Sequence, residues 1–249
     1  MNNSLIDMRN VSLEFAQTEK SILKDISYKI YAKDFIIIVG SNGSGKSSLL
    51  KIINKTFKMS SGTILLDGKS INDYLQKTIN RMVKTITQNC HESLFMSLSI
   101  LENYILIKQQ YEPNLFSMSY KAERDFLSEY LLSFNAKLSL KLNQSVEQLS
   151  GGEKQALVLA LTMLYPPRIL LLDEHTSALD PKAADKLMRL TKQLVEQHNI
   201  TCLLTTHDLL DAKHYGNRIL ALRNGVIHHT IEQEVKMTLT QQALLSACY

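Results

Sequence analysis

The sequence has few cysteines and no long apolar run. Its three cysteines, Cys90, Cys202 and Cys248, are an odd number without the spacing of a zinc site, so a disulfide framework is not indicated. We therefore expect reduced thiols and a cytosolic protein. No apolar stretch approaches the ~20 residues that a membrane-spanning helix needs. The polar start, Met1 to Ser4, has no basic region leading into an apolar block, so we expect no signal peptide.

Excess charge and repeats are also lacking. The 28 basic and 24 acidic residues leave a net charge of +4, and the lysines are scattered along the chain. Nucleic-acid-binding domains usually carry a clustered basic stripe, so we expect no nucleic-acid partner. We find no internal repeat or low-complexity tract, and 45% of the 249 residues are hydrophobic, as in a globular protein with a real core. Because no apolar stretch is long enough to span a bilayer, any membrane role must come through a partner protein.

Glycine is scarce, with nine in the chain, yet three fall in one short segment. The segment consists of Gly40, Ser41, Asn42, Gly43, Ser44, Gly45, Lys46, Ser47 and Ser48. A chance match to its pattern, G-x-x-x-x-G-K-[ST], is expected about 0.004 times in such a chain. An apolar run at 35–39 precedes the segment and a helical pattern at 49–53 follows it, which is the context of a phosphate-binding P-loop.

The chemistry of this loop indicates phosphate binding. Glycines let backbone N–H groups approach phosphate oxygens, and the helix that follows directs its positive dipole end at the same anion. We expect Lys46 to reach the outer phosphates and the Ser47 hydroxyl to face Mg²⁺.

Strand and helix patterns alternate along the chain. Apolar and polar residues alternate at 6–15 and 26–30, which predicts β strands. Short apolar runs at 169–172 and 200–204, with a helical pattern at 181–198 between them, are typical of buried parallel strands. We expect an α/β fold: a P-loop NTPase core with a mostly parallel sheet, an N-terminal antiparallel β part and an inserted helical subdomain. The predicted organisation is one domain, 1–249, with the core at 1–88 and 161–249 and the helical subdomain at 89–160.

The helical block contains an aromatic stripe. Phe126, Tyr130 and Phe134 follow one another at i, i+4 and i+8, with Leu127 and Leu131 beside them. We expect this stripe to be the buried face of an amphipathic helix.

Two acids end the apolar run at 169–172. An acid at the carboxyl end of such a strand, here Asp173, is placed to hold Mg²⁺, and the next residue, Glu174, is placed to polarise an attacking water as general base. Behind a P-loop we prefer this interpretation to a pair of solvent-facing acids.

A second candidate anion site lies at Leu149-Ser-Gly-Gly-Glu153. Ser150 with Glu153 three residues later is also an ordinary capping box for the helix that begins here. Because the P-loop already holds the phosphates of its own nucleotide, a second site would serve the nucleotide of another subunit.

The order of these motifs resembles the nucleotide-binding subunit of ATP-binding cassette (ABC) transporters. The resemblance rests on the P-loop, Gln88, the segment 149–153, Asp173-Glu174, Ser177-Ala-Leu-Asp180 and His207, and it covers the chain to about residue 230. The resemblance implies that Phe15 stacks on adenine and that Gln88 touches Mg²⁺ or water. It implies that Ser150, Gly151 and Gly152 contact the γ-phosphate across a dimer, and that Asp180 links the two sites of the dimer. His207 would contact the γ-phosphate and position Glu174. A strand-core role competes for Phe15.

The resemblance also implies cofactors and partners. ATP and Mg²⁺ would be bound, the metal by Ser47, Gln88 and Asp173. The partners would be a transmembrane permease, a second copy of the chain and an extracytoplasmic substrate-binding protein, with the chain on the cytoplasmic face of the plasma membrane.

A narrower resemblance concerns the residue after Glu174. His175 stands where most members of the family have proline. Together with the rest of the segment 173–182, this residue resembles an uptake subgroup associated with tryptophan/tyrosine-type substrate-binding proteins. Asn89 and Cys90 depart from the Asp-Pro that usually follows Gln88 in that subgroup, which leaves the cargo open.

Three alternatives stay open. Leu94, Phe95 and Met96 either form an apolar groove for a permease helix or pack the helical block. The chain could also be a soluble ABC ATPase of DNA repair or translation without a permease; such chains carry a long coiled coil or two cassettes, and neither is visible here. A nucleotide-sensing module without turnover would lack the catalytic acid, but Glu174 is present.

Overall fold

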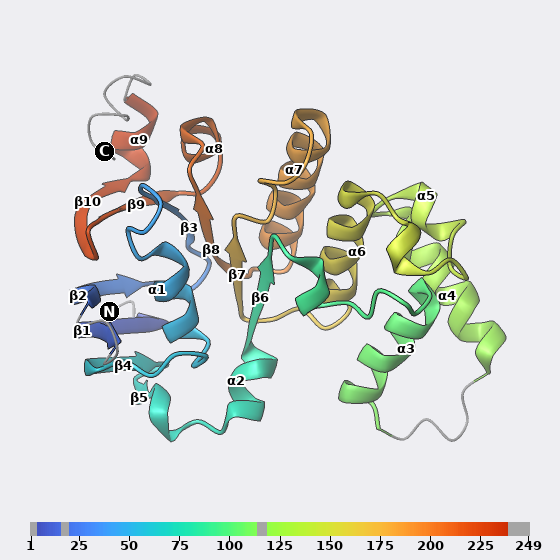
Figure 1. The fold of residues 1–249 in the computed structure, drawn as a ribbon, viewed down its shortest axis with the longest axis horizontal. Coiled ribbons are helices and arrows are strands. Elements are labelled where there is room, and N and C mark those ends of the chain that lie inside the picture. The colour runs from blue at the N-terminus through green and yellow to red at the C-terminus, as the bar shows by residue number, and fades with distance from the viewer. Residues whose placement is uncertain (1–3, 16–19, 114–118, 239–249) are drawn as a thin grey trace. The chain divides into compact units, whose positions relative to one another are not determined.

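The computed structural model describes residues 4–15, 20–113 and 119–238, without the side chains of Phe15, Lys20 and Met237. The described elements fall into two compact units. The first comprises Met1–Thr85, Pro167–Glu174 and Val195–Tyr249, and the second comprises Ile86–Pro166 and His175–Leu194, each as far as it is described. Figure 1 labels the elements of both units along the chain.

Two sheets form the framework of the first unit. Among the described residues, an antiparallel sheet has the order β2-β1-β4-β5, and a mixed sheet has the order β10-β9-β3-β8-β7-β6. In the mixed sheet, β3 runs parallel to β8 and β9, and β7 runs parallel to β8, whereas β10 is antiparallel to β9. The strands are β1 Ile6–Phe15, β2 Lys20–Ile30, β3 Phe35–Val39, β4 Ser61–Leu66, β5 Lys69–Ser70, β6 Val83–Thr87, β7 Ile169–Asp173, β8 Thr201–Thr206, β9 Arg218–Arg223 and β10 Val226–Glu232.

The central strands are apolar because both of their faces are buried. All five residues of β3 and all six of β8 are buried, including Cys202, whose thiol pKa is raised by burial. Continuous Ile, Leu and Val runs are what a parallel strand covered on both faces requires. The prediction of an α/β fold with a mostly parallel sheet and an antiparallel N-terminal part is confirmed.

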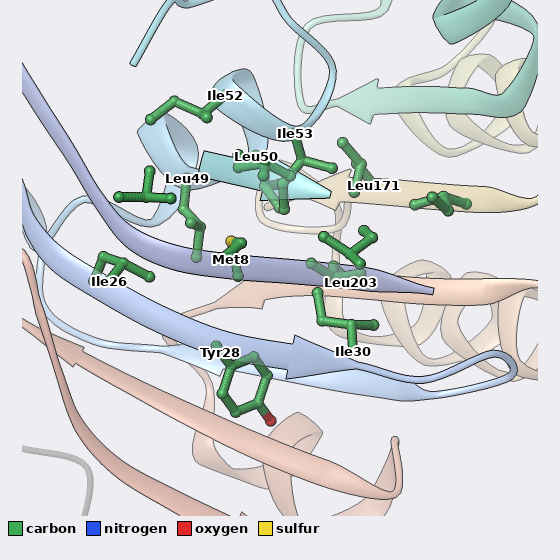
Figure 2. Packing of buried hydrophobic residues seen from close by; sticks show 14 of the residues in the cluster. Met8, Ile26, Tyr28, Ile30, Leu49, Leu50, Ile52, Ile53, Leu171 and Leu203 are labelled. Carbon is green, nitrogen blue, oxygen red and sulfur yellow. The ribbon is translucent and has the colours of Figure 1, made fainter. Parts of the chain in front are cut away.

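Helix α1, Lys46–Ile53, joins the main core of the first unit. Its buried residues Leu49, Leu50, Ile52 and Ile53 belong to one apolar cluster with side chains of both sheets. Figure 2 shows members of this cluster, among them Met8 of β1, Ile26 of β2 and Leu171 of β7. Because the helix begins directly at the glycine-rich loop, this packing fixes the loop to the sheet. The other helical segments of the unit are η1 Ile71–Asp73, α2 Gln76–Met82, α8 Leu209–His214 and α9 Gln233–Thr238.

The second unit is helical in its described residues, apart from the end of β6. Its segments are η2 Cys90–Glu92, α3 Ile100–Tyr111, α4 Tyr120–Leu132, α5 Ala136–Ser139, η3 Val146–Gln148, α6 Gly151–Met163 and α7 Pro181–Gln197, of which α7 ends in the first unit. This unit differs in extent from the predicted subdomain at 89–160, since it runs from Ile86 to Pro166 and adds His175–Leu194.

The predicted buried face of α4 is confirmed in part. Leu127 and Leu131 are fully buried and Phe134, just beyond the end of the helix, is also buried, whereas Phe126 is half exposed. Tyr130 is partly buried and its hydroxyl donates to the carbonyl of Ala160 at 2.9 Å. The leucines and Phe134 therefore pack inward, and Phe126 lies at the edge of the buried face, because residues four apart on a helix share a face.

Candidate functional site

The glycine-rich loop joins β3 to α1 with a backbone that side chains would disrupt. A Cβ on Gly40 would lie 2.2 Å from the Leu222 carbonyl oxygen. Gly45, the N-cap of α1, has a φ of 105° and makes no side-chain cap. The first N–H groups of α1 have no intrahelical acceptor and no capping side chain, so they are available to bind an anion.

The side chain of Lys46 contacts the main chain of the loop that precedes it. Its side chain is 5% exposed, and its ammonium donates to the carbonyls of Gly40 at 2.8 Å and Ser41 at 3.3 Å. The same Nζ lies 3.6 Å from Oε1 of Glu174. The loop thus holds a buried positive charge next to the carboxylate that follows β7.

Ser47 and Asp173 meet across the loop. The Ser47 hydroxyl donates to Oδ1 of Asp173 at 2.9 Å. A hydroxyl and one carboxylate are hard oxygen ligands of the kind that Mg²⁺ uses beside substrate phosphates. The described residues contain no cluster of three or more His, Cys, Asp or Glu side chains that could hold a metal alone. A metal at this site would thus need oxygens from a nucleotide, and the residues present fit Mg²⁺ in that way.

Thr205 orients Asp173 and the main chain of Glu174, a role that the sequence motifs did not predict. The parallel register places Thr205 of β8 opposite Asp173. The buried Thr205 hydroxyl donates to Oδ1 of Asp173 at 2.7 Å and accepts the N–H of Glu174 at 3.1 Å. The available signal was a polar Thr205-Thr206 pair ending an apolar strand, just before His207.

Glu174 sits in a backbone conformation that is uncommon for a residue with a side chain. Its φ is 47°, and its N–H is also within 3.2 Å of the Thr205 carbonyl oxygen. One carboxylate oxygen faces Lys46, and the other lies 3.8 Å from Nδ1 of His207, whose side chain is 60% exposed. Such strain at a strand end is tolerated where the surroundings fix the residue, and it is frequent at functional sites.

His175 is buried without a hydrogen-bond partner for either ring nitrogen among the described residues. Burial lowers the pKa of its imidazole to about 4, so the ring is neutral at pH 7. The neutral form is the one that a buried histidine adopts when no charged partner compensates its burial.

In the second unit, Ser150 begins α6 with the predicted capping box, which is confirmed. The Ser150 hydroxyl accepts the N–H of Glu153 at 3.3 Å, and the Glu153 carboxylate accepts the N–H of Ser150 at 3.0 Å. Gly151 and Gly152 form the first turn, and a Cβ on Gly151 would lie 3.6 Å from the side chain of Leu179. The segment presents two glycine N–H groups at a helix N-terminus.

The remaining predicted residues are placed as follows. Gln88 is exposed after β6, and its carbonyl, like that of Thr87, accepts from the buried Gln155 side chain at 3.0 Å. Asp180 is an exposed N-cap of α7, where Oδ1 accepts the N–H of Lys182 at 3.1 Å and of Ala183 at 3.0 Å. The stacking role predicted for Phe15 concerns a side chain outside the described residues.

The structure therefore gathers Lys46, Ser47, Asp173, Glu174 and His207 within the first unit. Gln88, Asp180 and the segment 150–152 belong to the second unit. Comparison with known proteins identifies the family of the chain. The family model described as ABC transporter matches residues 23–177. The chain belongs to the ABC transporter family.

Relatives of this ABC protein are named as transport subunits. It is 32% identical over 244 residues to a tyrosine transport ATP-binding protein of Clostridioides difficile, covering 97% of each chain. It is 28% identical to a phosphonates import ATP-binding protein of Oceanobacillus iheyensis, covering 90% of this chain and 89% of that one. A methionine import ATP-binding protein of Staphylococcus aureus is 31% identical over 91% of this chain but 65% of its own length.

Solved structures agree on the fold. CbiO1 of Clostridium perfringens, described as part of an ABC transporter complex, superposes with a TM-score of 0.78 at 23% identity, covering 93% of this chain and 90% of that one. The ATP-binding cassette MJ0796, described as a dimer in a post-hydrolysis state with ADP and Pi, gives 0.74 at 27% identity, covering 92% and 98%. This chain is thus an ABC ATPase that binds and hydrolyses ATP.

Proposed function

We propose that this ABC ATPase drives an uptake system for a small solute such as an amino acid. The observation that carries ATP hydrolysis as the driving reaction is the position of Glu174, whose carboxylate lies 3.6 Å from the Lys46 ammonium and 3.8 Å from the His207 ring, beside the P-loop. Similarity to tyrosine transport, methionine import and phosphonates import subunits supports import.

The nucleotide phosphates bind to the loop at 40–48. Backbone N–H groups of the loop and the start of α1 surround the phosphates, and Lys46 moves its ammonium from the Gly40 and Ser41 carbonyls to the outer phosphates. Phe15 at the end of β1 is proposed to stack on the adenine ring.

Ser47 and Asp173 would hold Mg²⁺, with Gln88 as the further ligand. When bound, the metal neutralises charge on the phosphate oxygens and orients them. The 2.9 Å contact between the Ser47 hydroxyl and Asp173 supports this assignment, because both groups already converge on one point.

Hydrolysis uses Glu174 as the general base. A water oxygen bonds to the γ-phosphorus while the bond to the β–γ bridging oxygen breaks, and the water proton passes to the Glu174 carboxylate. The Lys46 ammonium stabilises charge on the transferring group, and His207 holds the carboxylate and the γ-phosphate in register. The hydrogen bonds from the Glu174 N–H to the hydroxyl and the carbonyl of Thr205 fix the main chain that carries the base.

A second copy completes each site. Two chains close head to tail, and the segment 150–152 of each meets the γ-phosphate on the P-loop of the other, with Asp180 linking the sites. The exposed glycine-rich start of α6 supports this role, as does the dimeric, nucleotide-bound description of MJ0796. Loss of the γ-phosphate removes the bridge and opens the dimer.

The permease contact is proposed at Phe95 and the nearby Gln88. The Phe95 side chain is 61% exposed while Leu94 beside it is buried, which favours an apolar contact with a partner over core packing. The chain would then sit peripherally on the cytoplasmic face of the plasma membrane, with an extracytoplasmic substrate-binding protein supplying the solute. The soluble DNA-repair or translation alternative is not favoured, because the similar proteins are named as transport subunits.

Substitution of Glu174 by Gln tests the proposal. The amide keeps the size of the side chain but cannot accept the proton, so we expect ATP binding to persist and hydrolysis to fall at least about a hundredfold. With ATP and Mg²⁺ the variant should accumulate as a dimer in sedimentation velocity, and Glu129→Gln on the exposed side of α4 should behave as the parent chain. Full hydrolysis by Glu174→Gln would place the base elsewhere, and a persistent monomer would contradict the dimer.

A further inference from the structure

A largely buried carboxylate occupies the helix end that faces the proposed partner nucleotide. Glu153, the third residue of α6, is 9% exposed. Its Oε2 accepts the Ser150 N–H at 3.0 Å, so this oxygen is used for capping. The N–H groups of Gly151 and Gly152 have no intrahelical acceptor and stay available for an anion.

The other oxygen of Glu153 is held by Lys141. Lys141 follows α5 in the chain, and its Nζ donates to Oε1 of Glu153 at 2.6 Å. Burial opposes ionisation of Glu153, but hydrogen bonds from Lys141 and Ser150 outweigh burial and lower the pKa of the carboxyl. The pair is therefore a charged one, and both side chains are mostly shielded, at 29% and 11% exposure.

This charge matters because of where it lies. A helix N-terminus carries roughly half a positive charge, which a full carboxylate charge in its first turn would more than cancel. An anion approaching Gly151 and Gly152 would then meet net negative charge. Lys141 cancels the carboxylate and leaves the helix dipole and the two glycine N–H groups to act on the anion.

We propose that Lys141 is a positioning residue for the segment 150–152: it holds Glu153 on the Ser150 side and neutralises it, so that the start of α6 can receive the γ-phosphate bound by a second copy of the chain. This inference rests on the proposed ATP-dependent dimer. It adds a residue to that site which no motif in the sequence contains.

The test uses the full chain carrying Glu174→Gln, which retains the bound ATP. Four proteins are compared: this parent, and the parent with Lys141→Met, with Lys141→Met and Glu153→Gln together, or with Lys137→Met. Lys137 is an exposed lysine on α5 and serves as the matched charge control. Sedimentation velocity with Mg·ATP gives the dimer dissociation constant, and titration with a fluorescent ATP analogue gives nucleotide affinity of the monomer.

We expect Lys141→Met to raise the dimer dissociation constant about tenfold, because the unpaired Glu153 carboxylate would repel the γ-phosphate of the second copy. The nucleotide affinity of the monomer should change less than about twofold. The double variant should return to within about threefold of the parent, because Gln keeps the cap without the charge. Lys137→Met should match the parent. Circular dichroism melting of each variant verifies that the fold is kept.

Three results would overturn the inference, and they distinguish failure of the role of Lys141 from failure of the dimer. If the parent dimerises and Lys141→Met dimerises equally well, or if the double variant is as weak as the single one, the role of Lys141 is refuted while the dimer stands. If the parent itself stays monomeric with Mg·ATP, the proposed dimer fails and the role of Lys141 fails with it.

Discussion

Thr205 is the residue on which both acids of the site depend. Its hydroxyl joins Asp173 to the backbone of Glu174, so one buried side chain fixes the proposed metal ligand and the proposed base. A hydroxyl is required because it must donate to a carboxylate and accept from an N–H at the same time.

Replacing Thr205 by Val should therefore impair the chemistry while keeping the shape of the strand. We expect kcat to fall about tenfold and the Mg²⁺ concentration for half-maximal activity to rise, because each charge-assisted hydrogen bond contributes about 1.5 to 3 kcal/mol. Steady-state ATPase assays over a Mg²⁺ series measure both quantities. Thr205→Ser keeps the hydroxyl and should retain most activity, and a fully active Thr205→Val would show that the acids are fixed by other contacts.

Single residues were predictable from sequence only where a motif fixed their spacing. Lys46, Ser47 and Asp173 follow from the loop and from the strand that ends in acids; the structure joins Ser47 to Asp173 and places Lys46 beside Glu174. The roles of Thr205 and Lys141 could not be predicted in this way. Thr205 contacts Asp173, which lies far away in the chain, and an irregular segment separates Lys141 from Glu153. No local periodicity specifies that Lys141 meets Glu153, since that contact depends on how α5 and α6 pack.

Elements were predicted better than their packing faces. The apolar run at 169–172 is β7, and the helical pattern at 181–198 is α7, Pro181–Gln197. On α4, in contrast, the aromatic row at 126, 130 and 134 and the leucine row at 127 and 131 have the same spacing. Periodicity alone does not decide how deeply each residue of two adjacent apolar rows is buried: both leucines and Phe134 are buried here, whereas Phe126 is half exposed.

The segment after Gln88 divides its apolar residues between core and surface. Leu94 is buried, whereas Phe95 is 61% exposed. The buried Asn103 side chain fixes the Phe95 backbone: Oδ1 accepts its N–H at 2.8 Å and Nδ2 donates to its carbonyl at 3.0 Å. The Phe95 ring is thus presented from an anchored main chain.

Truncating Leu94 should destabilise the fold, whereas truncating Phe95 should not. Leu94→Ala should lower the free energy of unfolding by about 2 to 5 kcal/mol because it leaves a cavity. Phe95→Ala should change the free energy of unfolding by less than about 0.5 kcal/mol, as for an exposed position. Urea unfolding followed by circular dichroism measures both. Equal losses for the two variants would mean that Phe95 packs the helical unit and has no free apolar surface for a permease.

At the scale of the whole molecule, the groups of the proposed reaction are distributed over two units. The first unit holds the P-loop, both acids and His207, and the second holds the segment 150–152. No helix in the described part of the chain is long and apolar enough to cross a bilayer. The central claim is that each reaction site combines the first unit of one copy with the second unit of another.

Complementation between two inactive variants tests this claim most directly. Lys46→Ala removes the phosphate-binding ammonium, and Gly151→Asp places a negative charge at the start of α6, where a Cβ would lie 3.6 Å from the Leu179 side chain and has room. In an equimolar mixture about half of the dimers contain one of each chain, and each mixed dimer has one intact site, built from the P-loop of Gly151→Asp and the segment 150–152 of Lys46→Ala.

The measurement is the ATPase rate of each variant alone and of the mixture at the same total concentration. We predict that the separate variants are nearly inactive and that the mixture recovers up to about a quarter of the parent rate. A mixture no faster than the sum of its two components would contradict the account, because sites completed within a single chain cannot be restored by mixing.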